Sequence, residues 1–285
     1  MSNFKELKSI ELASFTTIGM GISVLFSIIA AIIISIFAIA VIPNGISFVI
    51  YLIPTVIVGS FILSIYSTFS EGFFYNLLAK KLKTIAIELK DGKEIVKIST
   101  TETATMLAII LTIQIILLYL VSVFVLPILL TSVIQTLVYS GQQIVAYNIY
   151  QLLIVISQPT TIGIIIFGTF IITFVFTLIG TSIYNILGKK GRGISLNLST
   201  ENSMTSIDSI DCLKLAIAFA IINGILNLIL AIIMIISGGA LPASIGNIIG
   251  GFVGGFIEAY LIGMFYNFLA PKLGKLKLEL IDLKI

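Results

Sequence analysis

One carboxylic acid stands out among the few residues of this sequence that could carry chemistry. Glu258 lies in a long apolar stretch, about sixteen residues after Pro242 and about thirteen before Pro271, so roughly 20 Å of helix separates it from either end. An ionisable group at that depth in a bilayer is costly and indicates a functional site by default. We expect a neutral acid that hydrogen-bonds another helix, with proton or ion handling as the alternative.

A second carboxylic acid, Glu71, lies closer to the basic end of another apolar stretch. It precedes Lys80 by about nine residues, which is about 14 Å along a helix. A side chain at that depth can extend to the interface or pair with a cytoplasmic lysine. We therefore expect Glu71 to act as an anchor, with proton or ion handling again as the alternative.

Three amide side chains also lie within apolar stretches. Asn223 and Asn227 share one face of a helix because they are four residues apart, and Gln114 lies in an earlier stretch. Amides inside a bilayer commonly hydrogen-bond neighbouring helices and contribute about 0.6 to 2 kcal/mol each. We expect all three to serve helix packing rather than to line a polar path.

The stretch that contains Glu258 also contains glycines at the spacing that lets two helices approach closely. They form two overlapping sets: Gly246, Gly250 and Gly254, and Gly251 and Gly255. The partner is either the preceding helix or another subunit, and a glycine-lined pore is the alternative. A nucleotide-binding loop is excluded, because these glycines lie within an apolar helix and follow no strand.

The composition indicates a membrane protein without a catalytic centre. The chain has 285 residues, of which 58% are hydrophobic and 10% charged, and its mean hydropathy is +1.19, whereas soluble domains contain about 25% charged residues. It has no histidine and one cysteine, Cys212, so the usual ligands of zinc, haem and iron–sulfur centres are missing. No nucleophile with an adjacent base is evident. We expect no metal, no cofactor and no enzymatic activity.

A Tyr-Asn pair recurs three times, each time after an apolar stretch. The pairs are Tyr75-Asn76, Tyr184-Asn185 and Tyr266-Asn267, and the segments that follow them align without a gap. This self-similarity predicts three parallel repeats, at residues 1–92, 93–200 and 201–285. A tyrosine suits the membrane interface, and an asparagine can satisfy backbone groups at a helix end. We expect the pairs to close the fold rather than to form a ligand site.

Each repeat is predicted to contain two membrane-spanning helices, each of which needs about 20 apolar residues. The expected helices cover residues 14–42 and 54–79, 103–130 and 159–187, and 211–236 and 242–270. Pro54, Pro159 and Pro242 lie at or near the start of the second helix of each pair, where the missing N–H is not needed. An outer-loop insertion at residues 131–157 is expected to form an amphipathic surface helix, with a re-entrant segment as the alternative.

Short strands are predicted before and after each helical pair. Strict alternation, as in Leu276, Leu278 and Leu280, is typical of a half-buried strand, and Asp91-Gly92 between two such segments indicates a hairpin. The expected fold is an all-α bundle of six transmembrane helices with a small cytoplasmic β cap of up to six strands. Pairing of the first strand, at residues 4–10, with the last would close this cap and leave fewer exposed edges.

The basic residues fall into four groups, all on one side of the membrane if six helices cross it. The groups lie at residues 5–8, 80–97, 189–214 and 272–284, and the loops expected on the other side, at 43–53, 131–158 and 237–241, carry no charge. The positive-inside rule therefore predicts a multi-pass protein of the cell membrane with both termini in the cytoplasm. The net charge of +3 is too small and dispersed for nucleic-acid binding. The expected partners are lipids and either a second copy or another membrane protein.

The Tyr-Asn-x-x-Ala/Gly motifs, best matched from Tyr266 to Leu280, resemble those of a family of uncharacterised prokaryotic, largely archaeal membrane proteins. The resemblance implies the same order of strand, helical pair and strand over most of the chain. Leu276 and Lys275 depart from the isoleucine and glycine that the pattern prefers. The family has no assigned activity to carry over.

Two functions are compatible with these features. The first is a non-enzymatic membrane scaffold or interaction module, with the β cap as the surface that faces a partner. It accounts for the few ionisable residues in the apolar stretches and for the close-packing glycines. The second is a channel or transporter for protons, cations or a small solute, with Glu258 as its coupling or selectivity residue.

Overall fold

The computed structural model describes residues 2–41, 45–201, 203–238 and 241–283 of the chain. They form two compact units. The barrel unit consists of Met1–Thr103 and Leu178–Ile285, and the insertion unit consists of Ala104–Thr177.

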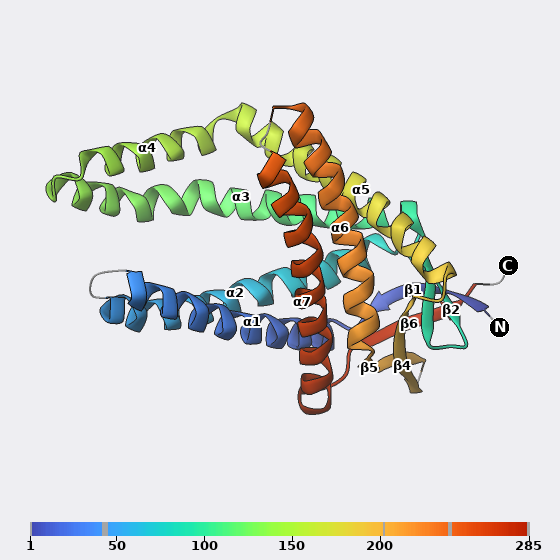
Figure 1. Ribbon diagram of the computed structural model, residues 1–285. Helices are drawn as coiled ribbons and strands as arrows, with labels where there is room; N and C mark the ends of the chain where they lie inside the picture. The colour runs from blue at the N-terminus through green and yellow to red at the C-terminus, as the bar shows by residue number, and fades with distance from the viewer. Residues whose placement is uncertain (1, 42–44, 202, 239–240, 284–285) are drawn as a thin grey trace. The chain divides into compact units, whose positions relative to one another are not determined.

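The strands of the barrel unit form one closed barrel, in which each strand pairs with its neighbours in chain order (Figure 1). The described strands are β1 (Ser2–Ile10), β2 (Ala86–Lys90), β3 (Glu94–Ile98), β4 (Ile194–Glu201), β5 (Met204–Ile210) and β6 (Lys277–Asp282). All neighbouring strands are antiparallel. β1 and β6 pair between Lys5 opposite Asp282 and Ile10 opposite Leu278, which confirms the predicted pairing of the first and last strands.

The predominantly helical character of the predicted fold is confirmed, but its small β cap is corrected, because the strands form a complete closed barrel. Each alternating segment of the sequence becomes a strand with a partner on both sides, and a closed barrel leaves no strand edge exposed. Asp91 and Gly92 have φ angles of 51° and 69°, as a type I′ turn requires at both central positions. The hairpin predicted between β2 and β3 is therefore confirmed.

The described residues also form seven helices, six of which are long and apolar enough to cross a membrane. The helices are α1 (Leu12–Val41), α2 (Gly45–Leu78), α3 (Thr100–Tyr139), α4 (Gln143–Ser157), α5 (Pro159–Lys189), α6 (Cys212–Ile236) and α7 (Leu241–Leu273). The short helix is α4. The predicted number of long apolar helices is confirmed, and each predicted helix corresponds to one of them.

α2 begins earlier than predicted, at Gly45 instead of residue 54. Gly45 lies against the backbone of α1, and the carbonyl oxygen of Ala38 would be 2.3 Å from a Cβ at this position. Only glycine allows so close an approach. The second helix therefore starts close beside the first, and most of the predicted loop is helical.

The prolines do not all mark helix starts. Pro54 lies inside α2, which is tolerated in membrane helices more readily than in soluble ones. Pro159 and Pro242 are the first and second residues of α5 and α7, as predicted. Pro43 lies outside the described residues.

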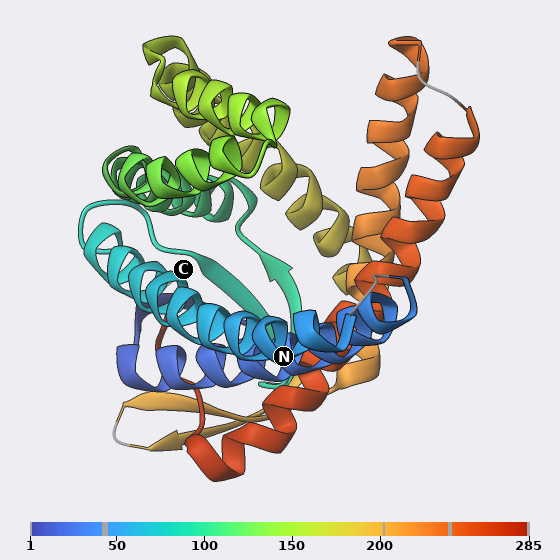
Figure 2. The ribbon, with the colours of Figure 1, turned by 90° about the vertical axis from the view of Figure 1, so that its left-hand side faces the viewer.

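The insertion unit contains most of α3, all of α4 and the first part of α5. α3 continues well past residue 130 to Tyr139, and Gly141, with φ at 79°, lies in the turn that leads to α4. The Tyr119 hydroxyl donates to the Ile156 carbonyl at 2.5 Å, and the two helices run side by side (Figures 1 and 2). The prediction of one surface helix over residues 131–157 is wrong in its bounds. Residues 131–139 contain no proline or glycine that would end α3, so they continue that helix.

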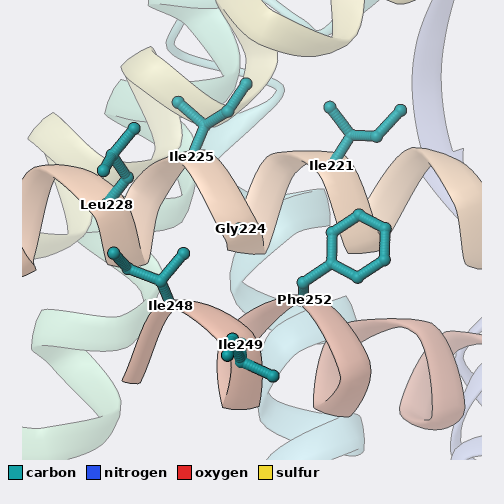
Figure 3. Close-up of a pocket in the computed structure, with 7 residues that line it drawn as sticks. All are labelled: Ile221, Gly224, Ile225, Leu228, Ile248, Ile249 and Phe252. Atoms are coloured by element: carbon teal, nitrogen blue, oxygen red, sulfur yellow. The ribbon is translucent and has the colours of Figure 1, made fainter. Parts of the chain in front are cut away.

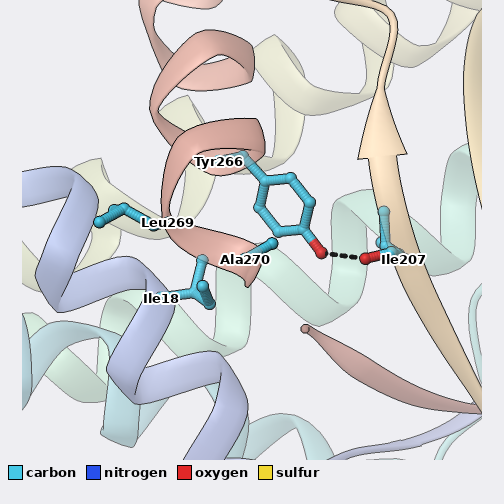
Figure 4. Packing of buried hydrophobic residues seen from close by; sticks show 5 residues of the cluster. All are labelled: Ile18, Ile207, Tyr266, Leu269 and Ala270. Atoms are coloured by element: carbon cyan, nitrogen blue, oxygen red, sulfur yellow. Dashed lines mark hydrogen bonds between the residues drawn. The ribbon is translucent and has the colours of Figure 1, made fainter. Parts of the chain in front are cut away.

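The core of the barrel unit lies where β5 meets α1 and α7. Its buried members are Ile18, Ile207, Tyr266, Leu269 and Ala270 (Figure 4). Leu276 and Leu278 pack against this cluster, which confirms the predicted apolar face of the last strand segment. Because burial of a Leu or Ile side chain contributes about 1.5–3 kcal/mol, this cluster attaches both helices firmly to the barrel.

Candidate functional site

The three Tyr-Asn pairs lie near the ends of α2, α5 and α7, where these helices reach the barrel. Each tyrosine is buried, with 3% of its surface exposed. Each hydroxyl donates to a carbonyl of the strand before its helical segment: Tyr75 to Leu7 at 2.6 Å, Tyr184 to Ile95 at 2.5 Å and Tyr266 to Ile207 at 2.5 Å (Figure 4). The tyrosines therefore link the ends of these helices to the barrel strands through buried hydrogen bonds.

Each asparagine makes two hydrogen bonds to the last residue of that same strand. Its amide N–H donates to the carbonyl and its amide oxygen accepts from the backbone N–H, each at 2.8 Å: Asn76 with Ile10, Asn185 with Ile98 and Asn267 with Ile210. The expectation that each asparagine serves its own helix end is therefore wrong. The amides satisfy the strand residue that lies two positions before α1, α3 or α6 begins.

The tyrosine oxygens also accept hydrogen bonds from the strand segment that follows. The Ile194 N–H donates to Tyr184 at 3.1 Å and the Leu276 N–H donates to Tyr266 at 3.2 Å, while the backbone of Ile85 hydrogen-bonds Tyr75. Each pair thus links the strand before a helical segment to the strand after it. We call these three sets of hydrogen bonds the Tyr-Asn clamps.

Glu258 lies on an exposed face in the middle of α7. Among the described residues it has no hydrogen-bond or ion-pair partner. The described spans also contain no lysine or arginine near its depth, because the basic residues of α5, α6 and α7 lie in their terminal turns. Glu258 is thus a carboxyl group that the barrel unit itself leaves without a charge partner.

The two predicted packing amides of α6 lie against one of the two glycine sets of α7. A Cβ on Gly251 would be 2.2 Å from the Asn227 amide nitrogen, and a Cβ on Gly255 would be 2.5 Å from that of Asn223. Asn227 also donates to the Asn223 carbonyl at 2.9 Å. The asparagines and these glycines therefore form one interface between α6 and α7.

The other glycine set faces away from α6. Gly246, Gly250 and Gly254 have nothing within 4 Å of a Cβ built on them. Glu258 follows Gly254 by one helical turn, so it lies on the same face of α7. The sequence spacing alone did not separate this open face from the face that packs on α6.

Glu71 and Gln114 lie on other helices, α2 and α3. Glu71 is half-buried on α2, next to Gly72, which packs against Leu12 and Phe15 of α1. Gln114 is buried, with 5% of its surface exposed, and it has an interaction partner. Its burial agrees with the packing role expected for it, which stays a prediction.

An apolar groove of about 410 Å³ lies between α6 and α7 (Figure 3). It is lined by Ile221, Gly224, Ile225, Leu228, Ile248, Ile249 and Phe252. Neither Glu258 nor Glu71 lines it. The sequence reasoning missed this groove, and Gly224 was the available signal, because a Cβ at this position would lie only 3.2 Å from the Phe252 ring, so the glycine lets α6 and α7 approach closely there.

Ion pairs lie on the surface of the barrel. Lys8 pairs with Glu6 at 2.8 Å and Lys275 with Asp208 at 2.8 Å. The hydrogen bond from Lys8 holds the pKa of Glu6 below its ordinary value. Hydrogen bonds from Lys275 and then Ser199 do the same for the pKa of Asp208.

Comparisons with protein families, with curated proteins and with solved structures found no match to this chain.

Proposed function

We propose that this protein is a non-enzymatic multi-pass membrane scaffold, in which a closed barrel holds the ends of three helical segments. The observation that carries this proposal is the recurrence of the Tyr-Asn clamp at all three places where a helix returns to the barrel. A buried hydrogen-bonding group left without a partner costs about 1–3 kcal/mol. Clamps of this kind therefore favour one rigid arrangement of the helix ends.

The clamps also support an origin of the chain in three copies of one unit. The strand carbonyls that the tyrosines bind belong to Leu7, Ile95 and Ile207, and the residues that the asparagines bind follow three positions later in every case. Each unit is a strand, a helical segment and a second strand. The middle unit carries α4 as an addition.

The barrel is proposed to lie on the cytoplasmic side of the cell membrane together with both termini. The basic groups of the sequence fall on the barrel strands and on the helix ends next to them, which is the distribution that the positive-inside rule describes. Lys284 lies outside the described residues. Because the barrel has no free edge, a partner would bind its side chains rather than add a strand.

A proton or cation transporter is the second candidate, and the position of Glu258 favours it. A carboxyl group in mid-span without a partner in its own unit must meet a polar group of another helix, a second copy or a translocated ion, because hydrocarbon solvates it poorly. The scaffold proposal assigns Glu258 to contact with another membrane helix. The transport proposal places it on a permeation path.

Flux through purified protein in liposomes separates the two candidates. Under an imposed pH gradient, with proton and cation flux recorded, the scaffold proposal expects native protein, Glu258→Gln and the barrel control Glu88→Gln all to match empty liposomes. Flux through native protein and Glu88→Gln that disappears in folded Glu258→Gln would contradict the scaffold and establish transport.

A further inference from the structure

The three clamps define equivalent positions at the junctions between successive repeats. Seven residues after the carbonyls of Leu7, Ile95 and Ile207, near the start of a helix, the chain has Ser14, Glu102 and Lys214. Eleven residues after the clamp tyrosines, in the strand region that follows, it has Ala86, Ser195 and Lys277. At each junction, the residue near the helix start lies beside the strand residue that ends the preceding repeat: Glu102 beside Ala86, Lys214 beside Ser195, and Ser14 beside Lys277.

Two of these junctions are bridged by the chain itself. At the junction of the second and third repeats, the Lys214 ammonium donates to the Ser195 hydroxyl at 2.8 Å and lies 4.0 Å from a Glu94 carboxylate oxygen. At the junction of the third and first repeats, the Lys277 N–H donates to the Ser14 hydroxyl at 3.1 Å. A hydrogen bond thus links the helix start to the neighbouring strand in both.

The junction of the first and second repeats has no bridge between these two positions, because the Ala86 N–H donates instead to Ser99, immediately before α3. Its positions hold Glu102 and Ala86, and both line a cavity of about 450 Å³. The Ala86 N–H is taken by the Ser99 hydroxyl oxygen at 3.0 Å. Glu102 makes no hydrogen bond or ion pair with any residue that the structure describes. A cavity with an unpaired carboxyl group therefore lies where Lys214 fills the second junction.

The charges around this cavity indicate what would fill it. Glu6 lines the cavity but is already paired with Lys8, so Glu102 is the acid that remains for a ligand cation. Lys83 also lines the cavity, is exposed and has no ion-pair or hydrogen-bond partner among the described residues. Ser99 uses its hydroxyl oxygen as an acceptor, which leaves its O–H to donate.

We propose that this cavity binds a small zwitterion that carries a primary ammonium group and an anionic group. The ammonium group pairs with Glu102 and the anionic group pairs with Lys83, the two charged residues that line the cavity without an ion-pair partner among the described residues. Charge-assisted hydrogen bonds of this kind are the strong ones, and the volume is within the range of small-molecule sites. Both a free phosphoethanolamine-like metabolite and the headgroup of an ethanolamine phospholipid have this chemistry.

Calorimetric titration of the purified full-length protein in detergent tests the proposal. We expect O-phosphoethanolamine to bind, and phosphocholine, which lacks N–H donors, and glycerol phosphate, which lacks the cation, to bind at least tenfold more weakly. Glu102→Gln should weaken binding of O-phosphoethanolamine at least tenfold and Lys83→Gln should weaken it several-fold. Glu88→Gln, on β2 but outside the cavity, is the matched control and should bind as the native protein does.

A second variant protects the test against misfolding. Glu102→Lys with Ala86→Ser rebuilds the bridge of the second junction, so it should fill the cavity, raise the thermal midpoint and abolish binding. The proposal is overturned if native protein binds no O-phosphoethanolamine, if phosphocholine binds equally well, or if folded Glu102→Gln or the double variant retains native affinity.

Nanodiscs distinguish the two sources of the ligand. If the lipid headgroup occupies the cavity, nanodiscs of phosphatidylethanolamine should lower the apparent affinity for soluble O-phosphoethanolamine at least tenfold relative to nanodiscs of phosphatidylcholine. Equal affinity in both supports the free metabolite. Each result depends on binding that requires Glu102, so the Glu102→Gln variant is measured in both membranes.

Discussion

Gly251 of α7 lies against the side chain of Asn227, whereas Gly250, one position earlier, has no atom within 4 Å of where its side chain would begin. Gly255 and Gly254 repeat the same contrast one turn later. The residue type and the spacing are the same on the two faces. Only the neighbour differs, so glycine spacing marks where a helix can be approached but not which approach the fold uses.

The packed face also shows why the amides of α6 are asparagines rather than larger residues. The amide of Asn227 occupies the space that a Cβ on Gly251 would need, and the amide also bonds the backbone of its own helix. A bilayer supplies little hydrophobic drive for helix association, so close packing and hydrogen bonds carry it. The open face of α7 carries Glu258 and has no such neighbour among the described residues.

The largest effect is expected from a side chain placed on the packed face. Gly251→Leu would overlap the Asn227 side chain and force α6 and α7 apart, which should lower the free energy of unfolding by about 3 kcal/mol. Gly250→Leu should change it by less than about 0.5 kcal/mol, because that position meets open space. Unfolding by SDS titration in mixed micelles measures both.

A similar loss of stability in the two variants would contradict the contrast between the faces. Gly251→Leu combined with Asn227→Ala is the internal control for the packed face. Removal of the asparagine side chain should relieve part of the overlap, and the double variant should be more stable than Gly251→Leu alone. Additive losses would show that Asn227 is not the group that the leucine meets.

A smaller effect is expected where the same helix reaches the barrel. Tyr266→Phe removes the hydroxyl that donates to Ile207 and accepts from Leu276, and it should lower the free energy of unfolding by about 1.5 kcal/mol. Tyr260→Phe is the control, because Tyr260 is 41% exposed on the same helix and should lose little. Equal losses in a denaturant titration would show that the clamp adds nothing specific at Tyr266.

The helices and strands could be predicted from the sequence more readily than the contacts between them. Long uncharged stretches and alternating segments predict helices and strands because those patterns are local. The partner of Tyr75 is Leu7, 68 residues away, and no local pattern encodes such a pairing. The recurrence of Tyr-Asn therefore identified the clamp residues but misplaced the groups that the asparagines bind.

The remaining misses have the same origin in contacts between distant segments. The start of α2 depends on the approach of Gly45 to Ala38, and the two glycine faces of α7 differ only because Asn223 and Asn227 lie on one side. The cavity beside Glu102 was missed because Glu102 and Lys214 become equivalent only when the strands are aligned on the clamps. A comparison of the repeats at those positions was the signal that could have found it.

The smallest effect is expected at the salt bridge between Asp208 on β5 and Lys275. This pair allows the same comparison, between a side chain that has a partner and one that lacks it, to be made on the barrel surface. The hydrogen bond from Lys275 lowers the pKa of Asp208 below its ordinary 3.8, so its stabilisation is present above that pH and is lost as the pH falls through the folded-state value. The thermal midpoint of the native protein should therefore fall more between pH 7 and pH 3 than that of Asp208→Asn. Lys272, which lies 3.3 Å from the Phe268 ring centroid rather than beside an acid, supplies the control, because Lys272→Gln should leave the acid-induced fall unchanged. An equal fall in native protein and Asp208→Asn would show that solvent screens this pair completely.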